Sequence, residues 1–219
     1  MSTENAENKA TDTIRKMIMD GQFEAAQTIT ETKLSAVLNL SRTPIRAAMK
    51  TLEAEGLLLK RDGRGYTARQ ISDTDLSDAF AVRGVLEGLA AHKLAMTGLS
   101  RIARERLDTS LITTENVVKR GKIDKDSLEA YAVANLIFHK TIMQAADNQF
   151  IIDCASRLNI LPPARLGAML DTDHSITRLT ISHAQHALIR RAIDTGDSDR
   201  AFSLMREHAS YTDEYFDLF

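Results

Sequence analysis

The pattern of hydrophobic positions along this 219-residue chain changes character near residues 70–73. Before that point, apolar residues recur at helical spacing only over short stretches, which predicts short helices. These helices are expected at residues 10–20, 33–38 and 41–55. Gly21 and Gly56 directly follow two of them, in keeping with the glycine that often ends a helix.

Two short apolar runs come next, Leu57–Lys60 and Tyr66–Arg69. They enclose an Asp62-Gly63 pair and a second glycine, Gly65, and this arrangement is typical of a β-hairpin. Short helices followed by a hairpin are the elements of a winged helix-turn-helix. We therefore predict a winged helix-turn-helix domain over residues 8–70.

From Ser72 onward the apolar positions predict long amphipathic helices, and no strand-like alternation occurs. These helices are expected at residues 73–96, 101–119, 126–146, 149–169, 176–194 and 198–217. The fold class is thus mainly α, with the winged domain followed by an all-helical bundle of six to seven helices over residues 73–219.

The composition agrees with a folded protein of the cytoplasm. Hydrophobic residues make up 43% and charged residues 26% of the chain, as in ordinary globular proteins. No apolar run approaches the roughly 18 residues that a membrane span needs, and the polar start MSTENAENKA is unlike a secretory signal. A single cysteine, Cys154, favours a reducing compartment. We expect a cytoplasmic protein without a membrane partner.

Charge is distributed unevenly. Residues 32–69 hold eight basic and three acidic side chains, a net charge of +5, whereas the whole chain carries −2. A cationic patch on an acidic protein is typical of a module that binds phosphates. A basic face that merely contacts solvent is the alternative that charge alone leaves open.

The stretch SRTPIRAAMKTL, from Ser41 to Leu52, favours the phosphate-binding interpretation. Arg42 and Arg46 lie about 40° from each other around a helix and ~6 Å apart along it. The second helix of a helix-turn-helix presents its first residues to base edges in the DNA major groove, where arginine binds guanine or phosphate. Arg61 and Arg64 at the hairpin would flank the minor groove or the backbone. The alternative is that the arginines only pair with Glu53, Glu55 or other surface carboxylates.

Residues 30–68, TETKLSAVLNLSRTPIRAAMKTLEAEGLLLKRDGRGYTA, resemble the DNA-binding domain of the GntR superfamily of bacterial transcriptional regulators. That family's pattern runs L-A-x-x-L-x-V-S-R-T-P-V-R-x-A-L and ends in a G-x-G wing. The resemblance implies that Arg42, Thr43 and Arg46 contact phosphates and bases and that Gly65 approaches the minor groove. Lys33 is a further candidate for a phosphate contact.

Three histidines of the helical half stand where apolar residues are expected, namely His139, His186 and His208. Buried polar groups need partners, and imidazoles that converge from three helices satisfy one another most readily through a metal. Two alternatives remain, a metal-free polar pocket and ordinary core histidines.

The segments AFAVRGVLEGLAAHKLA, NLIFHKTIMQAADN and HALIRRAIDTGDSDRAFSLMREHA resemble the FCD ligand-sensing domain of the FadR-like branch of the same superfamily. In that family an aspartate and three histidines hold a divalent metal, often zinc. The resemblance implies that Asn135, His139, His186 and His208 are the ligands here. Zinc is the expected metal, with nickel and manganese as alternatives.

Asn135 departs from the family pattern, because a neutral amide oxygen replaces a carboxylate. A divalent metal with neutral ligands carries about +2 instead of +1, which predicts weaker metal retention and a stronger attraction for an anionic effector. A small carboxylate fits this expectation. Arg83 resembles the family's pocket arginine, and His174, Arg178 and His183 are further candidates to line the pocket.

These observations predict a ligand-responsive transcriptional regulator that binds a palindromic operator as a homodimer, since two winged modules match two half-sites. The alternative is a constitutive DNA-binding protein with a vestigial, metal-free sensor. An enzyme is not expected, because the sequence lacks His-Glu-x-x-His, a Gly-rich phosphate loop and a nucleophile elbow.

Overall fold

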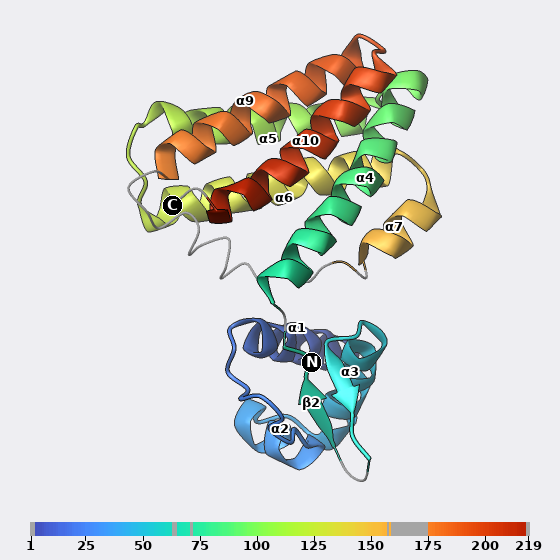
Figure 1. Cartoon of the computed structure of the whole chain (residues 1–219), viewed down its shortest axis with the longest axis vertical. Helices are drawn as coiled ribbons and strands as arrows, with labels where there is room; N and C mark the ends of the chain where they lie inside the picture. The colour runs from blue at the N-terminus through green and yellow to red at the C-terminus, as the bar shows by residue number, and fades with distance from the viewer. Residues whose placement is uncertain (1–2, 63–64, 71, 157, 159–174, 218–219) are drawn as a thin grey trace. The chain divides into compact units, whose positions relative to one another are not determined.

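The computed structural model describes residues 3–62, 65–70, 72–156, 158 and 175–217 (Figure 1). The chain divides into two compact units. The first is formed by Met1–Ser72, and the second begins at Asp73. The mainly α fold predicted from the sequence, a winged helix-turn-helix and a helical bundle, is confirmed.

Within its described residues, the first unit consists of three helices and a two-stranded antiparallel sheet. The elements are α1 (Thr3–Met19), α2 (Glu31–Leu38), α3 (Arg42–Ala54), β1 (Leu58–Lys60) and β2 (Tyr66–Ala68). Helix α1 begins at Thr3, earlier than residue 10, where the sequence analysis placed its start. The first turns were missed because they are polar and carry no apolar periodicity. The core is continuous across these elements and includes Ile14, Ile45, Met49, Leu52 and Leu58.

The turn between α2 and α3 is fixed by its end residues. Thr30 caps α2, since its hydroxyl accepts a hydrogen bond from the Lys33 amide. At the other end Asn39 takes a left-handed conformation with φ 51°, which asparagine tolerates better than most residues. The chain can therefore reverse within a few residues and start α3 at Arg42.

The wing, formed by β1 and β2, is held against the rest of the unit. Ile29 and Tyr66 exchange backbone hydrogen bonds of 2.7 and 2.9 Å, and the Tyr66 hydroxyl donates to Glu53 on α3. Gly65 has φ +100°, and a Cβ there would lie 2.7 Å from the Ile29 carbonyl oxygen. Only glycine fits this close approach.

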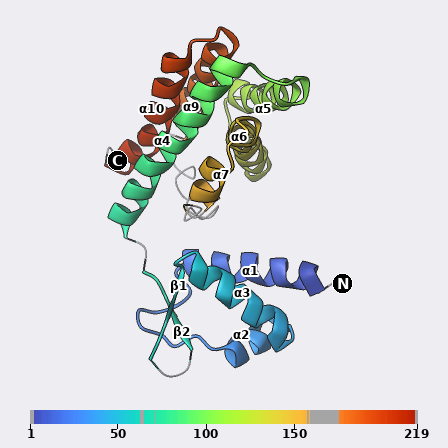
Figure 2. The ribbon, with the colours of Figure 1, turned by 90° about the vertical axis from the view of Figure 1, so that its right-hand side faces the viewer.

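The second unit is all helical within its described residues (Figures 1 and 2). Its helices are α4 (Asp73–Thr97), α5 (Arg101–Lys119), α6 (Lys125–Ala145), α7 (Gln149–Ser156), α9 (Ser175–Asp194) and α10 (Ser198–Asp217). The sequence predicted one helix over 149–169. Helix α7 covers its start, and most of the remainder lies outside the described residues.

The core of the second unit is built mainly from α4, α6, α9 and α10, and its largest members include Leu94, Phe138, Ile142, Ile189 and Met205. Three buried histidines, His139, His186 and His208, are embedded among these apolar residues. Any polar atom placed there must therefore find its partners within the protein.

Helices α4 and α10 lie side by side (Figure 2). Gly84 and Gly88 allow their close approach. A Cβ at Gly84 would lie 2.9 Å from the Ala209 Cβ, and one at Gly88 would lie 2.9 Å from the Phe202 ring. This packing brings the side chain of His208 to the centre of the unit.

Candidate DNA-binding surface and metal centre

Helix α3 buries one face and exposes the other. Ile45, Met49 and Leu52 are buried, while Arg42 and Arg46 are exposed. Thr43, at the exposed start of the same helix, and Lys33, on the exposed side of α2, are also accessible. The N-terminal amides of α3 are open to an anion, because within the described residues the Ser41 side chain makes no capping hydrogen bond.

Both arginines pair with Glu31, the first residue of α2. Its Oε1 accepts from Arg46 Nε at 2.7 Å, and its Oε2 accepts from Arg46 Nη2 at 2.9 Å and from Arg42 Nη2 at 3.2 Å. The side chains of Arg42 and Arg46 nevertheless stay 62% and 57% exposed. Both arginines thus contact a surface carboxylate, and their exposure leaves them available to a partner.

The carboxylates of Glu53 and Glu55, which the sequence analysis considered as partners of these arginines, bind other residues. Glu53 accepts from Tyr66, and Glu55 accepts from Arg15 on α1. Arg61 donates to the Ala26 carbonyl and the Thr28 hydroxyl, so it braces the loop before α2 against the wing. Arg64 lies outside the described residues, next to Gly65.

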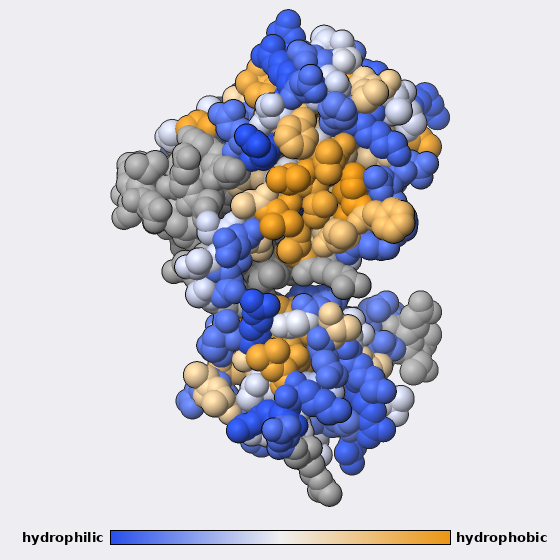
Figure 3. All heavy atoms as spheres, turned by 45° about the vertical axis from the view of Figure 1, so that its right-hand side comes forward, coloured by the Kyte–Doolittle hydropathy of each residue, from blue (hydrophilic) through white to orange (hydrophobic). Residues whose placement is uncertain are grey.

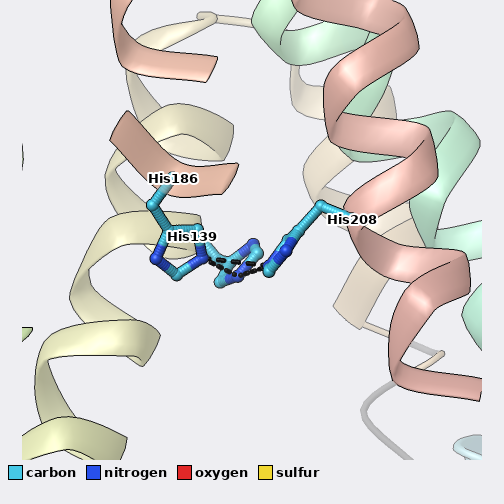
Figure 4. A group of neighbouring side chains, drawn as sticks. All are labelled: His139, His186 and His208. Carbon is cyan, nitrogen blue, oxygen red and sulfur yellow. Dashed lines mark hydrogen bonds between the residues drawn. The ribbon is translucent and has the colours of Figure 1, made fainter. Parts of the chain in front are cut away.

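In the second unit three buried histidines converge from α6, α9 and α10 (Figure 4). The Nε2 atom of His186 lies 3.3 Å from Nε2 of His139 and 3.0 Å from Nε2 of His208, and the remaining pair is 3.3 Å apart. His139, His186 and His208 are 9%, 0% and 6% exposed. The structure therefore brings together three of the four predicted metal ligands.

Two of the three imidazoles are oriented by acceptors behind them. Nδ1 of His139 lies 2.5 Å from a carboxylate oxygen of Glu87 on α4, and Nδ1 of His208 lies 2.8 Å from the amide oxygen of Gln185. Because these oxygens accept, both Nδ1 atoms carry the proton. In the neutral form of either ring, Nε2 then carries no proton and faces the centre of the site.

His186 is held differently. Its ring stacks on Phe138, with the centroids 4.1 Å apart and the planes at 21°. Its Nδ1 has no hydrogen-bond partner among the residues that the structure describes. Without a metal, Nε2 of His186 can donate one proton at the centre of the site. The Nε2 atoms of His139 and His208 would then compete to accept that one hydrogen bond.

The electrostatic environment favours the neutral form of two of these histidines, His186 and His208. Burial, together with the neighbouring His139, lowers the pKa of His208 to about 3. Burial also lowers the pKa of His186 well below its ordinary value, and the neighbouring histidines add to this effect. Burial by itself would raise the pKa of Glu87, but His139 and Arg83 outweigh it and hold that pKa well below its usual range.

The donor set fits a divalent metal. Nitrogen ligands about 2.0–2.1 Å from a tetrahedral zinc lie about 3.3–3.4 Å from one another, close to the separations of 3.0–3.3 Å between the three Nε2 atoms. Neutral imidazoles with bare nitrogens are the form that binds metal. A cation at the centre would also give each of the three Nε2 atoms a partner, which a single proton cannot do.

The other predicted pocket residues are more scattered. Asn135 is partly exposed and lies one turn before His139 on α6. Arg83 donates to Glu87 through Nε, so it belongs to the chain of contacts that ends at His139. Nδ1 of His183 lies 2.8 Å from the Thr114 hydroxyl of α5, and burial lowers its pKa.

Arg178 is partly exposed on α9, while His174 lies outside the described residues.

Sequence reasoning missed Glu87 and Gln185. Glu87 is 1% exposed on α4, and the signal for it was a charged residue in line with Ala91 and Leu94, one turn after Arg83. Gln185 carries no comparable signal, because only the packing of α9 against α10 brings it to His208.

No helix in the described part of the chain has the length and apolar character needed to cross a membrane.

Comparisons with known proteins agree on both units. The family of bacterial regulatory proteins named gntR matches residues 6–67, and the FCD domain matches residues 78–211. A probable D-xylose utilization operon transcriptional repressor of Paenarthrobacter nicotinovorans is 28% identical over 193 residues, which cover 88% of this chain and 80% of the relative. The transcriptional repressor GlaR of Escherichia coli K12 is 24% identical over 198 residues, covering 89% and 88%.

Among solved structures, McbR/YncC of E. coli has the same fold, with a TM-score of 0.70, 18% identity and coverage of 97% and 95%. The matched families and relatives are transcriptional regulators rather than enzymes.

Proposed function

Because the chain belongs to the GntR family of bacterial transcriptional regulators and carries an FCD ligand-binding domain, we propose that it is a metal-dependent sensor of a small carboxylate. In this proposal it binds a palindromic operator as a homodimer. The effector shifts the population between dimer arrangements that do and do not fit the operator.

The observation that carries this proposal is the convergence of three Nε2 atoms, two of them held as bare acceptors by Glu87 and Gln185. His139, His186 and His208, with Asn135 as a fourth ligand, would hold the metal, with zinc favoured over nickel and manganese. The metal would supply a positive centre for an effector carboxylate. Arg83 lies behind Glu87 and adds positive charge to the same region.

For the DNA-binding unit, the exposed side chains at the start of α3 support contact with the major groove by Arg42, Thr43 and Arg46. Lys33, Arg64 and Gly65 are proposed as the flanking contacts. Eight basic and three acidic residues between 32 and 69 supply the electrostatic attraction.

Helix α4 supports the homodimer. Val82, Val85, Leu89 and Met96 are 41–70% exposed and lie within about 60° of one another around the helix. They lie opposite the buried face that includes Ala91 and Leu94. A helix that is apolar on both faces is normally covered on both, and a second copy of this chain would cover the exposed one. Figure 3 shows exposed apolar side chains gathered on one face of this unit.

The decisive experiment is the metal content per chain, measured by elemental mass spectrometry on untagged protein purified without a chelator. About one divalent ion per chain is expected in the wild type and in His92→Ala, a histidine away from the triad that lies near Asp199. Little or none is expected in His139→Ala.

A metal-free wild type, even after soaking and desalting, would contradict the metal-dependent sensor. The neutral amide of Asn135 would then favour the alternative, a constitutive DNA-binding protein whose sensor domain is vestigial.

A further inference from the structure

Glu31 joins α2 to the start of α3 through contacts with both arginines proposed to read DNA. Its carboxylate engages Arg46 with both oxygens, at 2.7 and 2.9 Å, and Arg42 with one, at 3.2 Å. The Glu31 side chain is only 25% exposed, whereas both arginines are more than half exposed. The carboxylate therefore lies behind the guanidinium groups and leaves their outer edges accessible.

We propose that Glu31 determines DNA specificity by orienting Arg46 and Arg42 toward base edges and by weakening their attraction for phosphates. This inference rests on the proposed function, in which these arginines contact the operator.

The hydrogen-bond donors of Arg46 support the orienting role. A guanidinium group has five N–H donors in a fixed plane, and Glu31 accepts from Nε and from one N–H of Nη2. The edge formed by Nη1 and the second N–H of Nη2 is thus left for another partner. Its two parallel donors match O6 and N7 of guanine, so Arg46 can bind Glu31 and a guanine together.

The charge balance supports the discriminating role. The three side chains together carry +1, whereas the two arginines alone would carry +2. A phosphate near the guanidinium groups would also approach the Glu31 carboxylate, while the neutral guanine edge would not be repelled. The hydrogen bonds from Arg46 and then Arg42 hold the pKa of Glu31 below its ordinary value, against the effect of burial, so the carboxylate stays ionised.

Stability does not explain this cluster, because exposed ion pairs contribute little to the free energy of unfolding. Its geometry is instead suited to fix two long side chains that would otherwise sample many rotamers.

The test compares full-length wild type, Glu31→Gln and Glu24→Gln. Glu24 is an exposed carboxylate of the same unit, so its loss changes the net charge equally. Binding is measured by fluorescence anisotropy to a duplex that the wild type enriches from a random library, and to a shuffled duplex of the same composition. Both titrations are repeated over a salt series.

For Glu31→Gln we expect affinity for the shuffled duplex to rise by up to about tenfold at 0.1 M salt, with a slope against salt steeper by about 0.9. The ratio of specific to non-specific affinity should fall about tenfold, because the guanine contact loses its orientation. Glu24→Gln should keep the wild-type ratio.

An unchanged ratio of specific to non-specific affinity in Glu31→Gln would overturn the inference, whether both affinities stay the same or fall equally. Thr30→Ala removes the α2 cap without touching the arginines. If it lowers the ratio as much as Glu31→Gln does, the effect comes from helix stability and the inference fails. If the wild type enriches no duplex at all, the proposed operator binding fails first.

Discussion

At the scale of single residues, the proposed metal centre depends on side chains that do not face its middle. Glu87 and Gln185 each accept from an Nδ1 and so turn the unprotonated Nε2 of His139 and of His208 toward the centre of the site. Phe138 sets the plane of His186 by stacking. A histidine triad without these neighbours would have the same composition but undefined tautomers.

Glu87→Gln tests this dependence. The amide keeps the shape of the side chain but removes the charge that favours a protonated Nδ1 on His139. We expect zinc affinity to fall about 10–100-fold, the usual cost of losing a partner behind a ligand. Competition with a chromophoric chelator measures this, with Glu105→Gln on the exposed side of α5 as the control. Equal affinities in the three proteins would contradict the orienting role of Glu87.

At the scale of elements, the contact between α4 and α10 places His208. Gly84 and Gly88 leave no room for a side chain between these helices. The sequence shows the two glycines four residues apart, but not which helix they meet.

Gly88→Ala should therefore destabilise the helical unit by about 1–3 kcal/mol, the cost of overpacking. The sign is informative, since replacing glycine by alanine inside a helix otherwise stabilises it by roughly 0.5–1 kcal/mol. Urea unfolding followed by circular dichroism measures the change. A stabilised variant would show that α4 and α10 do not pack as closely as described.

At the scale of the whole molecule, the proposed metal binding and dimer formation would both stabilise the folded state. A ligand that binds only the folded protein raises the free energy of unfolding by RT ln(1 + L/Kd), where L is its concentration, and this amount grows with the ratio of L to Kd.

Zinc added to chelator-treated protein at 100 times its Kd should stabilise the chain by about 2.7 kcal/mol. Differential scanning calorimetry should record a higher Tm for the helical unit in the wild type and no comparable rise in His186→Ala. An identical rise in both proteins would place the zinc elsewhere.

The exposed apolar face of α4, formed by Val82, Val85, Leu89 and Met96, leads to a separate prediction about assembly. Leu89→Lys should weaken dimerisation by at least on the order of tenfold, because a charge would be buried at the interface. Ile112→Lys, an exposed apolar position on α5, should leave it unchanged. Sedimentation equilibrium distinguishes these outcomes, and a monomeric wild type would contradict the dimer.

Local signals explain which features the sequence predicted well. Helical periodicity, glycine positions and the Asp-Gly pair depend on neighbours within a few residues, so the winged domain and the long helices could be derived. The polar start of α1 and the end of the helix after Gln149 lacked such signals.

The sequence by itself therefore determined the two kinds of unit, the basic character of the first and the three histidines as candidates for one site. Only the tertiary structure decided that their Nε2 atoms meet, that Glu87 and Gln185 orient them, and that Glu31 holds Arg42 and Arg46. The physical reason is separation along the chain. Glu87 and His139 are 52 residues apart and His139 and His208 are 69 apart, so no local pattern encodes their contact and only the packing of helices creates it.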